Sequence, residues 1–303
     1  MSTAAVDPRE AWLAERATGI GGSDAAAVMG CSPWKSTFAL WAEKTGMAPA
    51  DSVENDAMEW GKRLEPVIAS KYAEATGREV KTFGAAFPEV LRHSERPYML
   101  GSLDGLVTRK DGEAPGVLEI KTTGIQRGDD WEEEAPLGYQ VQLQHYLAVT
   151  GRRWGSFAVL IGGQKFRWYD VERNDKFIAS LEARCEWFWG LVQRQEAPPV
   201  DDSQSTAEAL RSIYAGESGE TVDLGAASVD WCQELEAAKA AIAEAEARKR
   251  GAENQIKAAL GAASCGIVPG LGKFSFKAQR REAHQVAASE FRVLRFTKMK
   301  GGK

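Results

Sequence analysis

The sequence has few of the residues from which soft-metal and redox sites are built. Its 303 residues include only four cysteines and three histidines, and the cysteines lie far apart. There is no CxxC pair and no HExxH motif, which argues against a zinc ribbon, a thioredoxin-like redox site and a histidine-rich metal centre. Any metal in this chain is therefore expected to be a hard cation held by oxygen ligands.

The sequence also lacks long hydrophobic runs and an N-terminal targeting pattern. No run approaches the roughly 20 apolar residues that a membrane-spanning helix needs. The N-terminal segment MSTAAVDPREAW has neither the basic nor the apolar part of a secretory signal. Together with the scattered thiols, these absences predict a cytoplasmic protein without a membrane partner.

Charge is unevenly distributed, although the net charge of −5 does not itself mark a nucleic-acid-binding protein. Residues 273–303 contain nine Lys or Arg and two Asp or Glu, a local charge of +7. Residues 1–200 and residues 201–272 each carry −6. The basic C-terminal segment could contact phosphates or form a solvated tail, and the sequence leaves both readings open.

A polar segment with two prolines, EAPPVDDSQST at 196–206, divides the chain. It predicts one domain at 1–198, a linker at 199–227 and an accessory region at 228–303. The first region mixes helical and strand patterns, which predicts an α/β fold. The accessory region begins with a long Ala-, Glu- and Lys-rich helix at 228–260, and GKFSFKAQ and FRVLRFTK then alternate like the two strands of a hairpin.

The first region contains recognisable start and stop signals. Ser36 is expected to cap the helix TFALWAEKT, and Ser23 or Asp24 to cap the short helix DAAAVM. Pro66 is expected to kink or restart the helix that begins near NDAMEWGKRLE. Strands are predicted at 79–83, 98–108, 116–122, 155–162 and 165–171, with a hairpin between the second and third.

The predicted strand VLEIKTT (117–123) carries two charged residues, Glu119 and Lys121, which share one face because side chains alternate along a strand. Such residues are rarely fully buried unless they are paired. If YMLGSLDGLV pairs with this strand, Asp104 approaches both. Two carboxylates and a backbone carbonyl offer hard ligands to Mg²⁺, and the lysine can position a water. A surface hairpin with a Glu–Lys pair is the alternative that these residues alone leave open.

Three other segments contain candidate polar groups. Glu65 lies in WGKRLEP, at the predicted kink. The segment RATGIGGSDAAAVMG joins Arg16 to a glycine-rich turn and a helix start at Ser23, a combination that can bind phosphate. In QVQLQHY, Gln142 and Gln144 interrupt an otherwise apolar helix. Taken singly, each segment also fits an ordinary helix or turn.

Taken in order, five segments resemble the YqaJ-like viral recombinase family over about residues 10–195. They are RATGIGGSDAAAVMGCSPWKSTFALWAEKTG, WGKRLE, GSLDGLV, LEIKTT and QVQLQHY. That family includes the phage lambda-type exonucleases and belongs to the PD-(D/E)xK nucleases. Leu103 stands where the superfamily name has proline. The resemblance implies a central mixed β-sheet flanked by helices, and a phage or prophage origin in a bacterial host cell.

The resemblance also implies roles for the residues near the paired strands. Asp104, Glu119 and the carbonyl of Ile120 are expected to bind Mg²⁺, with Mn²⁺ as the alternative. Lys121 is expected to position the attacking water, and Glu65 to assist at the metal site.

The remaining roles that the resemblance implies concern DNA. Arg16, Ser23 and Ser102 match positions that hold the 5′-phosphate of a DNA end in the lambda-type enzymes. Gln142 and Gln144 fall in the last motif of the family, near the site. We count Gln142 among the DNA-binding residues and Gln144 among the catalytic ones.

These assignments predict a Mg²⁺-dependent exonuclease that degrades linear double-stranded DNA from 5′ to 3′. The resulting 3′ single-stranded overhangs would serve a strand-annealing recombination partner. The resemblance further implies a ring-shaped homo-oligomer, often a trimer. One alternative is a RecB-like or CRISPR-associated nuclease of the same superfamily, against which the lack of clustered cysteines argues. The other is a non-catalytic scaffold that binds DNA ends.

Overall fold

The computed structural model describes residues 8–49, 55–83, 89–109, 112–282, 288 and 292–295. The chain forms two compact units, Met1–Ala215 and Gly216–Lys303. Every strand and helix that positions the candidate site belongs to the first unit. Among the described helices, none combines the length and the apolar content that a membrane span needs.

A five-stranded mixed sheet forms the centre of the first unit, in the order β1-β4-β5-β6-β7. The strands are β1 (Glu79–Thr82), β4 (Gly105–Thr108), β5 (Gly116–Thr123), β6 (Trp154–Ile161) and β7 (Lys165–Glu172). Strands β5 and β6 run parallel, and the other neighbours run antiparallel. The hairpin predicted between the second and third strands is the antiparallel β4–β5 pair, which confirms it.

The strand predicted at 98–108 is divided in the structure. Its first part, β3 (Leu100–Gly101), pairs with β2 (Leu91–Arg92), and only β4 joins the central sheet. The break falls at Ser102, Leu103 and Asp104. One continuous β-strand pattern in the sequence therefore forms strands in two different sheets. The residues between β3 and β4 belong to neither strand, and they line the site.

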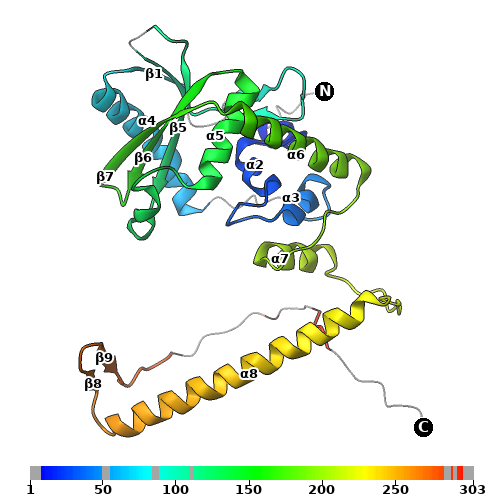
Figure 1. The fold of residues 1–303 in the computed structure, drawn as a ribbon, viewed down its shortest axis with the longest axis vertical. Coiled ribbons are helices and arrows are strands. Elements are labelled where there is room, and N and C mark those ends of the chain that lie inside the picture. The colour runs from blue at the N-terminus through cyan, green and yellow to red at the C-terminus, as the bar shows by residue number, and fades with distance from the viewer. Residues whose placement is uncertain are drawn as a thin grey trace, which may run out of the picture. The chain divides into compact units, whose positions relative to one another are not determined.

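Helices cover both faces of the sheet (Figure 1). Helix α4 (Asp56–Thr76) packs on one face, where Leu118 and Ile120 of β5 join its core. Helix α5 (Leu137–Thr150) packs on the other, together with α2 (Gly22–Val28), α3 (Thr37–Lys44) and α6 (Asp175–Arg194). The predicted α/β fold with a mixed sheet between helices is confirmed. Because side chains alternate, Glu119 of β5 faces the α5 layer.

Helix α4 runs through Pro66 without interruption, so the predicted restart at this residue is wrong. Proline removes the N–H that would bond to the Lys62 carbonyl, but the helix is tied down elsewhere. Asn55 caps its N-terminus, and Ile68 and Tyr72 anchor its second half in the core. Packing of one apolar face offsets the lost backbone hydrogen bond.

The glycine-rich turn near the N-terminus is bonded to the segment before β3. The Ile20 N–H donates to the Tyr98 carbonyl (2.7 Å), and the Leu100 N–H donates to the Ile20 carbonyl (2.8 Å). Gly19 is required here, because a Cβ at this position would lie 2.3 Å from the Tyr98 oxygen. The turn follows α1 (Pro8–Ala17), a helix that was not predicted from the sequence, and leads directly into α2.

Part of the predicted linker 199–227 is folded. Helix α7 (Gln204–Ile213) lies within it and packs on α3 in the first unit. The Ser36 N–H donates to Ser205 Oγ (2.9 Å), and Thr206 Oγ1 donates to Ser36 Oγ (2.8 Å). The segment was predicted as a linker because prolines and polar residues precede the helix and dominate the sequence pattern there.

The second unit contains helix α8 (Ala227–Leu260) and a hairpin of β8 (Cys265–Val268) with β9 (Gly272–Ser275). The helix matches the prediction at 228–260. The segment GKFSFKAQ does form a strand, but its partner is β8, so the predicted pairing with FRVLRFTK is wrong. Of FRVLRFTK, only residues 292–295 are described, and they form no strand; the remainder lies outside the described residues.

Candidate active site

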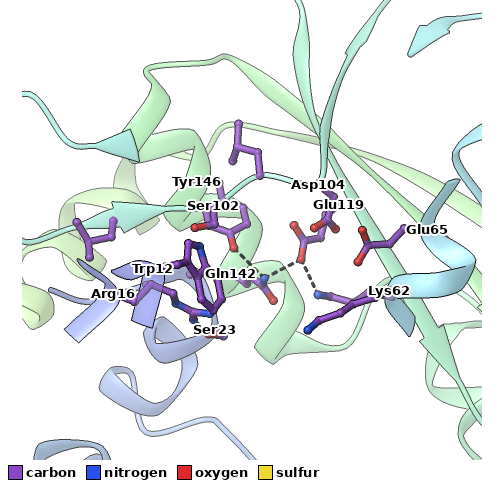
Figure 2. A pocket seen from close by; sticks show the side chains of 15 residues that line it. Trp12, Arg16, Ser23, Lys62, Glu65, Ser102, Asp104, Glu119, Gln142 and Tyr146 are labelled. Carbon is purple, nitrogen blue, oxygen red and sulfur yellow. Dashed lines mark hydrogen bonds and ion pairs between the residues drawn. The ribbon is translucent and has the colours of Figure 1, made fainter. Parts of the chain in front are cut away.

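A cavity of about 200 Å³ lies where α1, α2, α4, α5 and the β3–β5 strands meet (Figure 2). Acidic residues and lysines gather on one side of it, and Trp12, Arg16 and Ser23 on the other. The predicted site residues that line it are Arg16, Ser23, Glu65, Ser102, Asp104, Glu119, Lys121 and Gln142. Segments spread over more than 120 positions of the sequence are therefore brought to one cavity.

Glu119 is the most deeply buried acid of this cavity, with 1% of its surface exposed. Its Oε1 accepts hydrogen bonds from Lys121 Nζ (2.5 Å) and from Gln142 Nε2 (2.6 Å). Its Oε2 is buried and has no hydrogen-bond partner among the residues that the structure describes. A buried carboxylate oxygen without a partner is costly unless a ligand completes it, so this atom is available to a cation.

The strand register brings Asp104 to Glu119. In the β4–β5 pair, Gly105 lies opposite Leu118, so the next position in each strand places Asp104 beside Glu119. The Ile120 N–H donates to Asp104 Oδ2 (2.7 Å), which fixes the orientation of the carboxylate. The proximity predicted from YMLGSLDGLV and VLEIKTT is thus a direct result of hairpin geometry.

The carboxyl groups of the cavity hold protons more tightly than usual. Burial, followed by the charge of Asp104, raises the pKa of Glu119 to about 8. The same two causes raise the pKa of Glu65 to about 7. Burial also raises the pKa of Asp104. Carboxyl groups that stay protonated when the cavity holds no metal can become ligands when a cation replaces their protons.

Lys121 remains positively charged in this environment. Burial alone lowers its pKa, but the neighbouring carboxylates of Glu119 and Asp104 outweigh that effect and raise it. The pKa of the Tyr146 hydroxyl is raised by burial and by the same two acids, so this hydroxyl stays neutral. Gln142 Nε2 donates to this hydroxyl as well (3.2 Å). The amide therefore joins the tyrosine to the acidic cluster.

The donor set fits a hard divalent cation. Across the described part of the chain, no three His, Cys, Asp or Glu side chains cluster closely enough to hold a metal by themselves. A cation between Asp104 and Glu119 would therefore need further oxygens, which the Ile120 carbonyl and water can supply. Few carboxylates and several waters are the usual environment of Mg²⁺, and the partnerless Glu119 Oε2 gives it a place to bind.

The opposite side of the cavity is cationic and polar. Arg16 lies over the Trp12 ring (4.6 Å from guanidinium carbon to ring centre) and donates to Ser23 Oγ (2.9 Å). Lys44 Nζ bonds to Asp24 (2.9 Å) and to the Arg16 carbonyl (3.2 Å), so α3 braces the turn that carries Arg16. Burial alone would raise the pKa of Asp24, but the positive charges of Lys44 and Arg16 outweigh burial and lower the pKa overall. The carboxylate therefore stays ionised.

Asp24 also decides how α2 begins. Its side chain accepts the Gly21 N–H (3.0 Å), and Gly21 is the N-cap, so neither Ser23 nor Asp24 occupies the predicted capping position. The Ser23 hydroxyl is therefore turned toward Arg16. Gly22 is required for this packing, because a Cβ there would lie 2.3 Å from the Tyr146 ring.

Gln144 does not belong to the cavity, contrary to the prediction. Its Nε2 donates to the Glu172 carbonyl (2.8 Å), and its Oε1 accepts from the Asn174 N–H (2.9 Å). Two positions along an α-helix correspond to a turn of about 200°, so Gln142 and Gln144 cannot face the same site. Gln144 instead joins α5 to the connection between β7 and α6.

Among the lining residues that were not predicted for the site, three have aromatic or charged side chains: Trp12, Lys62 and Tyr146. Each lies one helical turn from a predicted residue, at i, i+3 or i, i+4 from Arg16, Glu65 or Gln142. Residues at these spacings lie on the same face of a helix. The spacing was the signal that could have identified them.

Comparison with known proteins identifies the family. Residues 11–153 match the YqaJ-like viral recombinase domain. The uncharacterized protein YqaJ of Bacillus subtilis strain 168 is 37% identical over 265 residues, which cover 86% of this chain and 81% of that protein. The chain belongs to the YqaJ family. A match of this length extends well beyond residue 200, so the likeness to this YqaJ relative includes much of helix α8, beyond the 10–195 range of the motifs.

Two solved structures are similar in part to this YqaJ-family chain. An alkaline exonuclease from Laribacter hongkongensis, also solved in complex with dAMP, is 25% identical with a TM-score of 0.49, covering 61% of this chain and 93% of the other. A phage-related exonuclease from Haemophilus somnus is 12% identical with a TM-score of 0.41, covering 59% and 96%.

Proposed function

We propose that this YqaJ-family protein is a Mg²⁺-dependent exonuclease acting on the ends of linear double-stranded DNA. Digestion proceeds from 5′ to 3′ and leaves 3′ single-stranded overhangs for a strand-annealing recombination protein. The active form is a homo-oligomeric ring, of which a trimer is one form. In such a ring only the channel must be basic, which suits a chain of net charge −5.

The observation that carries this proposal is the coordination gap at Glu119. One of its oxygens accepts hydrogen bonds from Lys121 and Gln142. The other is buried and has no hydrogen-bond partner within the described part of the chain. A Glu–Lys pair on the surface would be exposed to solvent and would have no buried carboxylate oxygen available to a cation. This arrangement supports a metal-dependent phosphodiester hydrolase, because a hard cation held there would polarise the phosphodiester and the adjacent lysine would offset negative charge.

The acidic residues and Lys121 have distinct roles in the proposed reaction. Asp104, Glu119 and the Ile120 carbonyl would hold Mg²⁺, which when bound polarises the scissile phosphate and lowers the pKa of a water. Lys121 orients that water and offsets negative charge in the transition state. Glu65, with its pKa raised to about 7, can exchange a proton with solvent near neutral pH.

The 5′-phosphate of the DNA end would bind on the cationic side of the cavity, near Arg16 and Ser23. Arg16 and Ser23 are already joined by a hydrogen bond and can receive the oxygens of a 5′-phosphate together with Ser102. The separation of an acidic and a cationic side within one cavity allows a terminal phosphate to be held while the next phosphodiester lies at the carboxylates.

The proposed function is tested with duplex DNA labelled at its 5′ or 3′ end. With Mg²⁺, the wild-type protein is expected to release the 5′ label early, and with EDTA it should release neither label. Lys121→Ala should lower the rate about 100-fold or more, since the charge that offsets the transition state is removed. Lys165→Ala, which removes an exposed lysine of the same sheet, should leave the rate unchanged. Early release of the 3′ label would refute the polarity, and DNA binding without any digestion would refute the activity.

The 5′-phosphate contact predicts a second result. Arg16→Ala should reduce the preference for phosphorylated over hydroxyl-ended duplexes by about 10-fold or more, because hydrogen bonds to charged groups contribute about 1.5–3 kcal/mol. Initial rates on the two substrates measure this preference. Arg194→Ala, at an exposed arginine of α6, is the matched control and should keep the wild-type preference. Equal preference in wild type and Arg16→Ala would remove the assignment.

A further inference from the structure

Helix α8 has large apolar side chains that the described residues of its own unit leave exposed. It is 34 residues long and contains no buried residue. Trp231 is 64% exposed, Ile242 is 63% exposed and Leu235 is 38% exposed. Figure 1 shows α8 as a single straight element. Large apolar side chains along an otherwise polar helix predict a partner for that face.

The apolar residues follow a seven-residue repeat. Leu235, Ile242 and Ile256 are spaced as successive a positions of a coiled coil, with Lys249 at the remaining one. Three residues after each a position the chain has only alanine; these d positions are Ala238, Ala245, Ala252 and Ala259. Large residues therefore alternate with small ones along one stripe.

Charge along α8 is divided between its two halves. Residues 227–247 contain five acidic residues and one basic residue, a net charge of −4. Residues 248–260 contain four basic residues and one acidic residue, a net charge of +3. In a parallel pair the like halves would face each other, whereas in an antiparallel pair each acidic half faces a basic half.

We propose that α8 forms an antiparallel two-helix coiled coil with α8 of a second copy of this chain. In an antiparallel pair, a positions meet d positions of the other helix. The register that centres on residue 247 then matches each large residue with an alanine: Leu235 with Ala259, Ile242 with Ala252 and Ile256 with Ala238. Alanine opposite isoleucine or leucine fills each layer without a clash and lets the helices approach closely.

The same register produces favourable contacts beside the stripe. Lys239 of one helix comes opposite Glu253 of the other, and the two-fold symmetry makes this pair occur twice. Among the flanking positions, like charges meet only at the two-fold axis. There Glu246 faces its own copy on one flank, and Arg248 faces its own copy on the other. The contacts beside the stripe therefore favour the antiparallel arrangement. The opposite charges of the two halves of α8 favour it independently.

Disruption of the stripe tests whether the second copy is the partner. In the full-length protein, Leu235→Asp with Ile242→Asp should weaken self-association about 100-fold or more, because a charge would be buried in two layers. Ala240→Asp places the same charge on the outer face of α8 and should leave association unchanged. Sedimentation equilibrium measures the constants, and circular dichroism checks that α8 remains helical. Equal association of all three proteins would overturn the proposal.

Disulfide formation tests the orientation independently of any contact between the first units. In a chain with Cys232→Ser and Cys265→Ser, Ile242→Cys and Ala252→Cys are made as separate variants. A mixture of the two should cross-link under mild oxidation, since these positions share a layer. Each variant alone should not, because an antiparallel pair separates equal positions by about 15 Å. Cross-linking of Ile242→Cys with itself would establish a parallel pair and overturn the proposal.

A charge exchange completes the test. Lys239→Glu should weaken association several-fold, and Glu253→Lys in the same chain should restore it, because both copies of the flanking pair are then reversed together. Failure of the double variant to recover would refute this register. None of these substitutions lies in the first unit, which contains the candidate active site. DNA digestion is therefore a separate measurement, and the proposed nuclease function can fail or hold without affecting this result.

Discussion

Replacing Glu119 by Gln is expected to abolish metal-dependent hydrolysis while the fold remains intact. The amide keeps the shape of the side chain, and its oxygen can still accept from Lys121 and Gln142. The amide nitrogen would occupy the position of the partnerless Oε2, where it repels a cation. The rate of DNA digestion should fall about 100- to 1,000-fold or more.

The stability of the Glu119→Gln protein should be nearly that of the wild type. Because the pKa of Glu119 is raised to about 8, this carboxyl is mostly protonated at pH 7 without metal, and glutamine resembles that neutral form. The free energy of unfolding in urea, measured with EDTA, should therefore change by less than about 1 kcal/mol. A large loss of stability would mean that the residue serves the fold and not the reaction.

Asp170 provides a matched control on the same sheet. Its carboxylate accepts from both nitrogens of Arg78 (2.7 and 2.6 Å) and from Arg109 (3.2 Å), and it does not line the cavity. Asp170→Asn should lower the free energy of unfolding by about 1–3 kcal/mol, because two guanidinium groups lose the negative charge of the carboxylate that they share. Its activity at a temperature where the protein is folded should be unchanged. The two variants thus separate a carboxylate used in chemistry from one used in stability.

Strand pairing was predictable because it depends on local signals. Alternating β-branched segments with a turn-rich connection define the β4–β5 hairpin, and the hairpin alone brings Asp104 to Glu119. The fate of residues 98–108 was not predictable, since nothing in YMLGSLDGLV marks a change of partner strand. The bonds that decide it come from Ile20, nearly 80 positions away. Long-range backbone pairing of this kind leaves no pattern in the sequence.

Helix geometry explains which of the predicted site residues line the cavity. The motif QVQLQHY contains two buried glutamines, and composition alone gives no reason to separate them. The 100° turn per residue does separate them, since Gln142 and Tyr146 share a face that Gln144 does not. Partners outside the motif were beyond prediction: the backbone groups that hold Gln144 belong to Glu172 and Asn174.

Magnesium affinity is expected to increase as pH rises from about 6 to 8. The carboxyl groups of Glu119 and Glu65 have pKa values raised to about 8 and about 7, with burial as the main cause, so both hold protons at neutral pH when the cavity is empty. A cation must displace those protons, and each proton released makes apparent affinity about tenfold stronger per pH unit. Isothermal titration calorimetry in buffers of different ionisation enthalpy measures both the affinity and the protons released.

The stability of the metal-free protein should change in the opposite direction over the same range. A carboxyl whose pKa is raised from about 4.5 to about 8 by folding contributes stability that is complete below 4.5 and lost as pH rises through 8. The melting temperature with EDTA should therefore fall toward pH 8, while the increase produced by Mg²⁺ should grow. Glu119→Gln removes the titrating group and should flatten both trends. A Mg²⁺ effect that is equally large at pH 6 and pH 8 would show that the cation binds without displacing these protons, and hence away from Glu119.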